Sequence, residues 1–125
     1  MAKEKYSIEF TLNTSPKLIY TRISTPSGLS EWFADNVQIN GKNFNFFWDG
    51  AEQVAKLLMK KVNEYVRFQW IDEDDDTYFE FRITKDELTG DVALVITDFA
   101  DTDEIEDSKD LWDSQVSELR RAIGL

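Results

Sequence analysis

Apolar and polar residues alternate with a period of two over most of the chain. The first example runs from residue 6 to residue 12, and its apolar members are Tyr6, Ile8, Phe10 and Leu12. The alternation recurs between residues 37 and 99, divided by pairs such as Asn40-Gly41 and Asp49-Gly50 that favour tight hairpin turns. Because this period is typical of half-buried strands, we expect a first strand followed by an antiparallel meander of about six more.

One face of the predicted meander is strongly aromatic. Large rings recur at alternate positions in three of its strands, at Phe46, Trp48, Phe68, Trp70, Phe79 and Phe81. The segment 54–62 is less regular. Its expected apolar positions are Val54, Leu58 and Val62, and Leu57 and Met59 blur the pattern. The aromatic rings are expected to form either a solid core or the wall of an apolar pocket.

Two short helices are predicted between the first strand and the meander. Ser15 is a suitable N-cap and Pro16 a suitable first residue for a helix that ends at the next proline. Residues 27–33 then form a second short helix or turn that carries Trp32 and Phe33. This pair either closes the core or lines a ligand site. Both can hold at once, because adjacent helical residues point about 100° apart.

The last part of the chain has helical periodicity. An apolar stripe at i, i+4, i+7 and i+11 is formed by Trp112, Val116, Leu119 and Ile123, and Leu111 widens it. The acidic stretch 101–107 before it is expected to be a solvated loop. A meander with one apolar face needs a cover. We therefore predict an α+β fold in which this helix covers the sheet.

This order of elements resembles the helix-grip fold of the START-like, or SRPBCC, superfamily. The sequence NTSPKLIYTRISTPSGLSEWFADNV (13–37) is similar to the opening of proteins related to the C-terminal domain of the heat-shock-chaperone ATPase activator. VRFQW (66–70), VALVITDFA (92–100) and LWDSQVSELRRAIG (111–124) resemble that group's central strand, last strand and final helix. The combination of SGLSEWFADNV with DELTGDV also resembles a small bacterial START-like family.

The resemblance covers essentially the whole chain and implies a single START-like domain over residues 1–125. It implies a curved antiparallel sheet of about seven strands around a long C-terminal helix, with two short helices after the first strand. A cavity often lies between sheet and helix in this superfamily. Its members include lipid and steroid carriers, polyketide cyclases, hormone receptors, oxygenase domains and co-chaperones, so the fold alone assigns no function.

Composition narrows the classes of partner and chemistry. The 125 residues carry a formal net charge of −11, which opposes nucleic acid and anionic membrane surfaces but leaves a basic protein surface or a cation open as a partner. The chain has neither cysteine nor histidine, which excludes thiol nucleophiles, Ser-His-Asp triads and the usual zinc sites. The first ten residues lack the apolar segment of a signal peptide, and no apolar run is long enough for membrane insertion. These features predict a cytoplasmic protein.

The remaining candidate groups predict no metal site, no cofactor and no catalytic residue. The acidic runs 72–76 and 101–107 do not fit an EF-hand loop, because Thr77 and Glu106 stand where that loop needs glycine. Glu80 shares a strand with the aromatic residues but points to the opposite face, and is expected to meet solvent. Asp98 and Tyr20 could approach the interior, but no residue is identified as a partner for either.

The leading prediction is therefore non-catalytic binding of a small hydrophobic ligand, a lipid or an aromatic compound, between the sheet and the C-terminal helix. The predicted pocket wall consists of Trp32, Phe33, Phe46, Trp48, Phe68, Trp70, Phe81, Trp112, Val116 and Leu119. A protein-interaction module of co-chaperone type, using the acidic surface, is the alternative. A polyketide-cyclase-like enzyme is the third candidate, and a buried polar group facing the cavity would favour it.

Overall fold

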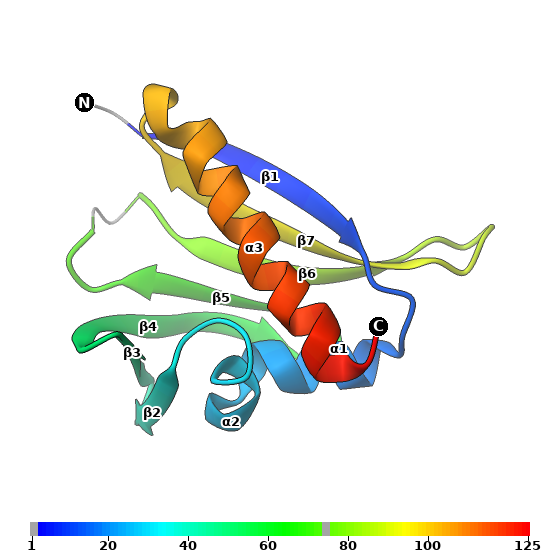
Figure 1. Cartoon of the computed structure of the whole chain (residues 1–125), viewed down its shortest axis with the longest axis horizontal. Helices are drawn as coiled ribbons and strands as arrows, with labels where there is room; N and C mark the ends of the chain where they lie inside the picture. Colours follow the sequence, from blue (N-terminus) through cyan, green and yellow to red (C-terminus); the bar gives the residue numbers. More distant parts are fainter. Residues whose placement is uncertain (1–2, 74–75) are drawn as a thin grey trace.

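The computed structural model describes residues 3–73 and 76–125, so the centre of the acidic run 72–76 lies outside the described residues. A seven-stranded antiparallel sheet has the order β1-β7-β6-β5-β4-β3-β2 and curves around a long helix (Figure 1). The strands are β1 (Glu4–Thr11), β2 (Asn36–Asn40), β3 (Asn43–Trp48), β4 (Ala51–Lys61), β5 (Tyr65–Trp70), β6 (Phe79–Lys85) and β7 (Val92–Ala100). The α+β helix-grip prediction is confirmed.

Three helices and one 3₁₀ turn accompany the sheet in the described part of the chain. They are α1 (Pro16–Ser24), α2 (Pro26–Leu29), η1 (Thr102–Glu104) and α3 (Ile105–Ile123). Ser15 caps α1 as predicted, because its Oγ accepts a hydrogen bond of 3.1 Å from the backbone N–H of Leu18. α3 crosses the concave face of the sheet, and α1 and α2 lie near the C-terminal end of α3 (Figure 1).

One predicted boundary near the helices was wrong. The stretch 101–107 is not a loop, because η1 and the first residues of α3 occupy it. Carboxylates in these first turns are stabilised by the positive end of the helix dipole, which explains why an acidic sequence becomes helical here. The predicted short helix or turn over residues 27–33 is present: α2 ends at Leu29, and Trp32 and Phe33 lie in the turn that follows it.

The inward face of β4 also differs from the prediction. Ala55 is fully buried and Leu57 packs against the core, whereas Leu58 and Val62 are exposed. Val54 lies between these extremes. The pairing with β5 shifts register between Leu57 and Met59, which is a bulge. A bulge breaks the period of two, so alternation along this segment does not report its buried face.

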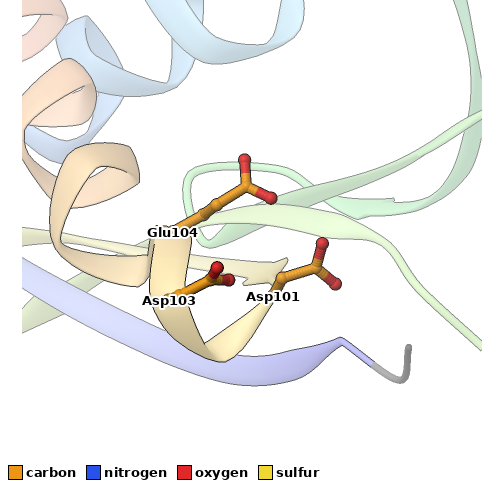
Figure 2. A group of neighbouring side chains, drawn as sticks. All are labelled: Asp101, Asp103 and Glu104. Atoms are coloured by element: carbon orange, nitrogen blue, oxygen red, sulfur yellow. The ribbon is translucent and has the colours of Figure 1, made fainter.

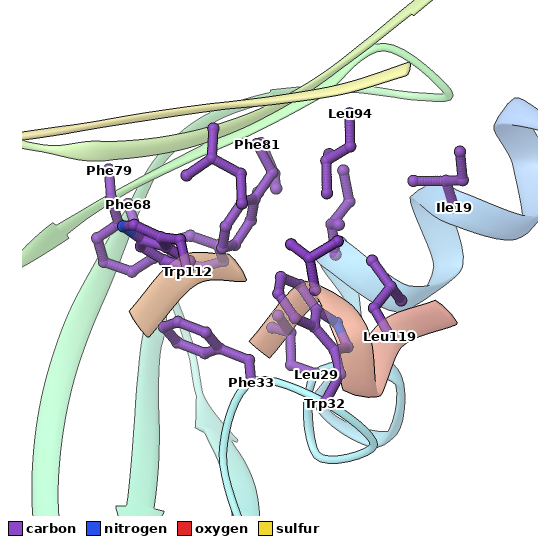
Figure 3. Packing of buried hydrophobic residues seen from close by; sticks show 14 of the residues in the cluster. Ile19, Leu29, Trp32, Phe33, Phe68, Phe79, Phe81, Leu94, Trp112 and Leu119 are labelled. Carbon is purple, nitrogen blue, oxygen red and sulfur yellow. The ribbon is translucent and has the colours of Figure 1, made fainter. Parts of the chain in front are cut away.

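The space between the sheet and α3 is filled mainly by aromatic rings (Figure 3). Phe46, Phe68 and Phe81 are completely buried, and Val116 and Leu119 pack against them from α3. The rings pack at angles, as in the edge contact of 5.0 Å between the centroids of Phe44 and Phe68. The deep part of the grip is therefore a solid core.

The convex face of the sheet carries a buried charge cluster that the sequence did not reveal. Glu80 points away from the aromatic face, as expected, but it is only 6% exposed. Arg67 and Arg82 cover it and bind both of its carboxylate oxygens, at 2.8 Å and 3.1 Å. The prediction that Glu80 meets solvent was wrong, because the long side chains of its neighbours exclude water from it.

Within residues 3–73 and 76–125, no helix is long and apolar enough to cross a membrane.

Candidate functional site

A cavity of about 350 Å³ opens beside the first half of α3, at the end of the sheet where β3 and β5 finish. Its wall combines rings and polar side chains from five elements and the turn after α2. The lining residues are Phe33, Trp48, Gln53, Trp70, Asp98, Ser108, Leu111, Trp112 and Gln115.

Phe33 is the centre of the aromatic part of this wall. Its ring stacks on Trp112, with centroids 5.6 Å apart and an angle of 10°, and meets Trp48 edge-on at 5.4 Å. Its carbonyl oxygen accepts hydrogen bonds from Trp48 Nε1 at 2.7 Å and Gln115 Nε2 at 3.0 Å. The turn after α2 is thereby fixed to β3 and α3 together. This makes the wall pre-formed rather than assembled by a ligand.

Asp98 is the ionisable group of the cavity. Trp112 Nε1 donates to its Oδ2 at 3.1 Å, the Tyr6 hydroxyl donates to the same oxygen at 3.4 Å, and the Phe99 N–H donates to Oδ1 at 2.8 Å. The Tyr6 hydroxyl also contacts Ser108 Oγ. Burial raises the pKa of Asp98 above its ordinary value, although the three donors act in the opposite direction. The expectation that Asp98 has no partner was wrong.

The predicted wall residues fall into two groups. Phe33, Trp48, Trp70 and Trp112 line the cavity. The others belong to the packed core behind it, at Phe46, Phe68, Phe81, Val116 and Leu119. Trp32 is also buried: its Nε1 donates to the Arg22 carbonyl at 2.8 Å, and its ring meets Phe81 at 5.3 Å. Of the adjacent pair, Trp32 therefore packs against the core, whereas Phe33 lines the cavity.

The sequence analysis missed the polar part of the wall, although one signal was present. Leu94, Ile96 and Asp98 have the same parity on β7, and the first two are completely buried on the concave face. That parity places Asp98 on the concave side of the sheet. Leu111 was expected to widen the buried stripe of α3, but it is 62% exposed and lies at the cavity rim.

A second group of carboxylates lies where β7 runs into α3 (Figure 2). One oxygen from each of Asp101, Asp103 and Glu104 lies within 4.8 Å of the others. A hydrogen bond with Asp101, reinforced by the nearby negative charge, raises the pKa of Glu104. Asp103 and Glu104 are exposed, and no further observation points to a bound ion. Tyr20, the other candidate, lies on α1 and does not line the cavity.

The model of the START-like superfamily domain matches residues 1–125, and the chain belongs to this superfamily. The resemblance inferred from the sequence is thereby confirmed. No curated protein sequence matches the chain.

Several solved structures are similar to this fold. The solution NMR structure of BfR322 from Bacteroides fragilis shares 44% identity, covers 100% of this chain and 94% of its own, and superposes with a TM-score of 0.70. The Aha1 dimer from Colwellia psychrerythraea shares 19% identity over 95% of both chains, with a TM-score of 0.79. CalU16 from Micromonospora echinospora shares 13% identity over 97% of this chain and 74% of its own, with a TM-score of 0.74. The last two likenesses show the fold alone.

Proposed function

We propose that this protein binds a small, largely apolar ligand with an aromatic body in the cavity between the sheet and α3, without catalysing a reaction. The observation that carries the proposal is a cavity of about 350 Å³ walled by Phe33, Trp48, Trp70 and Trp112. Ligand pockets are typically concave, mostly aromatic or apolar, and edged by a few polar groups. Gln53, Ser108 and Gln115 supply such polar groups here and would orient the ligand.

The volume favours a compact aromatic ligand over a lipid. A cavity of roughly 150 Å³ is sufficient for benzene, so this one is large enough for a bicyclic ring. A long acyl chain would have to continue into the grip and displace rings such as Phe46, Phe68 and Phe81, which are completely buried. The ligand is therefore expected to lie near the rim, between Leu111 and the faces of Trp48 and Trp70.

The first test is an NMR titration of the ¹⁵N-labelled protein with 2-naphthalenemethanol, a neutral bicyclic probe. We expect saturable shifts of the indole N–H signals of Trp48, Trp70 and Trp112, with a smaller change at Trp32. Trp70→Ala should weaken binding about tenfold or less, because an aromatic contact contributes about 0.5–1.5 kcal/mol. Trp112→Ala should weaken it too, but that ring also belongs to the core.

A pair of exposed leucines supplies the matched control. Leu111 lines the cavity and is 62% exposed, whereas Leu88 is 97% exposed on the turn between β6 and β7. Neither substitution by alanine should affect folding much, and only Leu111→Ala should reduce affinity. Equal effects of both variants, or no shift of the three cavity indoles at a saturating probe concentration, would refute the proposal. A native mass spectrum of protein purified without organic solvent can then identify a co-purified ligand from its added mass.

Catalysis of polyketide-cyclase type is a second candidate, favoured by one observation. Asp98 and Ser108 both line the cavity and are connected through the hydroxyl of Tyr6. A carboxylate with a raised pKa is suited to removing a proton next to a carbonyl group. The test is deuterium exchange of the methyl group of 2-acetylnaphthalene in D₂O. Exchange faster than in buffer, and absent in Asp98→Asn, would establish this chemistry, whereas exchange at the buffer rate would exclude it.

A protein-interaction role rests on the acidic surface and stays a prediction. It requires an association with a basic protein that weakens steeply as salt is added. A pull-down whose yield does not change with ionic strength would count against it.

A further inference from the structure

The cavity is surrounded by carboxylates on both sides. Asp98 lies in its wall, and the adjoining hollow at the turn after α2 shares Phe33, Trp48 and Gln115 with it. Acidic residues in that hollow are Glu31, Asp35 and Glu118. Two further hollows adjoin the cavity on the other side. One shares Trp70 and Asp98 with it and contains Glu73. The other shares Ser108 and Leu111 with it and contains Asp101, Glu104 and Asp107.

We propose that the ligand of this cavity is an organic cation, with a primary or secondary ammonium group attached to an aromatic body. This rests on the ligand-binding function proposed above and specifies its chemical class. A cation entering the cavity passes carboxylates on either side, whereas an anion is repelled along the same route. The net charge of −11 adds a long-range contribution with the same sign.

The wall itself is suited to a positive charge. Trp48 and Trp70 lie with their ring centroids 6.0 Å apart at an angle of 60°, and both are partly exposed toward the cavity. The face of a tryptophan ring attracts a cation within about 6 Å of its centroid, and the attraction strengthens when water is excluded. The parts of these rings that border the cavity therefore attract an ammonium group as well as an aromatic body.

Asp98 supplies an acceptor for such a group. A carboxylate offers about four acceptor positions. Trp112, Tyr6 and the backbone of Phe99 occupy three of them, and all three groups donate. Because these partners are donors, they suit the ionised form of the carboxyl group, and an N–H of the ligand would provide a fourth hydrogen bond. Burial makes that negative charge unfavourable on its own, so a cationic ligand compensates it.

The nearby bases are already engaged. Lys3 forms an ion pair of 2.7 Å with Glu73, and its positive charge also acts to lower the pKa of Asp98. Lys109 follows Ser108 on α3 and lies with its Nζ 6.0 Å from the Tyr6 ring centroid. Among the described residues that line the cavity and the three hollows, Lys3 is the only basic one. Glu31 and Glu118 are themselves paired with Arg22 and Arg121. The excess negative charge that a ligand cation would meet therefore comes from carboxylates without an ion pair among the described residues, which are Asp35, Asp98, Asp101, Glu104 and Asp107.

Three probes with one ring system separate this inference from the proposed function. They are 2-naphthylmethylamine, a cation at neutral pH, the neutral 2-naphthalenemethanol, and the anion 2-naphthoate. We expect the amine to bind at least about tenfold tighter than the alcohol, and the carboxylate to bind most weakly, with the cavity indoles as the reporters. If the alcohol binds as tightly as the amine, the cation inference fails and the proposed function stands. If no probe shifts the indoles, both fail.

Two variants locate the source of the preference. Asp98→Asn should reduce the ratio between the amine and alcohol affinities toward one, provided that the variant still folds. Asp107 is exposed in a hollow that adjoins the cavity and its replacement does not threaten the core, so Asp107→Asn should reduce the ratio about twofold. Asp113→Asn removes the same charge from an exposed position of α3 that lines neither the cavity nor the three hollows, and is the control. A ratio unchanged by both Asp98→Asn and Asp107→Asn would overturn the inference.

Discussion

The charge cluster on the convex face makes a specific prediction about stability. Glu80 lies opposite Arg67 in the pairing of β5 and β6. Its Oε1 accepts from Arg67 Nε at 3.0 Å and Nη2 at 2.8 Å, and its Oε2 accepts from Arg82 Nε at 3.1 Å. The guanidinium groups lie 4.0 Å and 4.4 Å from the ring centroids of Tyr78 and Tyr65. Glu80→Gln keeps the shape of the side chain, removes its charge and replaces one acceptor oxygen by an NH₂ group.

We expect Glu80→Gln to lower the free energy of unfolding by about 2 kcal/mol at pH 7. A hydrogen bond to a charged group contributes about 1.5–3 kcal/mol, and glutamine retains one acceptor oxygen. The two arginines have side chains that are 28% and 41% exposed, so water can hydrate them after the charge is lost. Both effects reduce the loss below the roughly 3–5 kcal/mol expected for breaking a fully buried ion pair.

The dependence on pH is the sharper part of the test. Burial alone would raise the pKa of Glu80, but hydrogen bonds from Arg82 and Arg67 outweigh it and the pKa is lowered. The charged form is therefore favoured by folding. Its stabilisation is complete above the unfolded pKa of about 4.3 and is lost as the pH falls through the lower folded pKa. The difference in free energy of unfolding between wild type and Glu80→Gln should therefore shrink as the pH falls.

Urea unfolding followed by tryptophan fluorescence at pH 7 and at pH 3 measures this difference. Glu87→Gln, at an exposed position of the turn between β6 and β7, is the matched control and should change stability by less than about 0.5 kcal/mol. A difference for Glu80→Gln that is the same at both pH values would refute the electrostatic explanation. It would indicate that altered packing, rather than lost charge, destabilises the variant.

Three further substitutions test the packing, each by the midpoint of urea unfolding. Gly28→Ala should lower the free energy of unfolding by about 1–3 kcal/mol, because the added Cβ would lie 2.7 Å from Arg22 Cα and closer still to the Thr21 carbonyl oxygen. Unchanged stability would contradict this close packing. Phe33→Ala should lose about 3–5 kcal/mol as a buried ring, and a smaller loss would mean that the cavity wall collapses. Ser15→Ala should lose about 1 kcal/mol with the cap of α1, whereas no loss would show the cap to be dispensable.

The sequence predicted those parts of the fold that depend on local periodicity. Alternation located the strands of the sheet, and the helical stripe of Trp112, Val116 and Leu119 is buried as expected. It failed on β4, where a bulge near Leu57 changes the parity, and on Glu80, whose burial depends on side chains of a neighbouring strand. Periodicity describes one strand at a time and contains no information about what covers its polar face.

The candidate site was less accessible to sequence analysis. Four of its aromatic residues were predicted, because large rings on one face of a strand are easily recognised. The boundary between a solid core and a cavity depends on the volume left between side chains, which no spacing encodes. The contact of Asp98 with Tyr6 joins residues 92 positions apart, and the hydrogen bond from Trp112 depends on where α3 crosses β7. Parity could have placed Asp98 on the inner face, but not identified its donors.

The position of β1 in the sheet has a consequence for biosynthesis. β1 pairs with β7, with Glu4 opposite Ala100, whereas β2 to β7 are joined to one another in chain order. During translation, β1 therefore stays without its pairing strand until β7 has left the ribosome, and α3 follows later still. Until then the aromatic face of the meander lacks its cover. Such exposed apolar surface promotes aggregation, so slow synthesis of the segment that forms β7 and α3 is expected to lower the yield of folded protein more than a delay elsewhere.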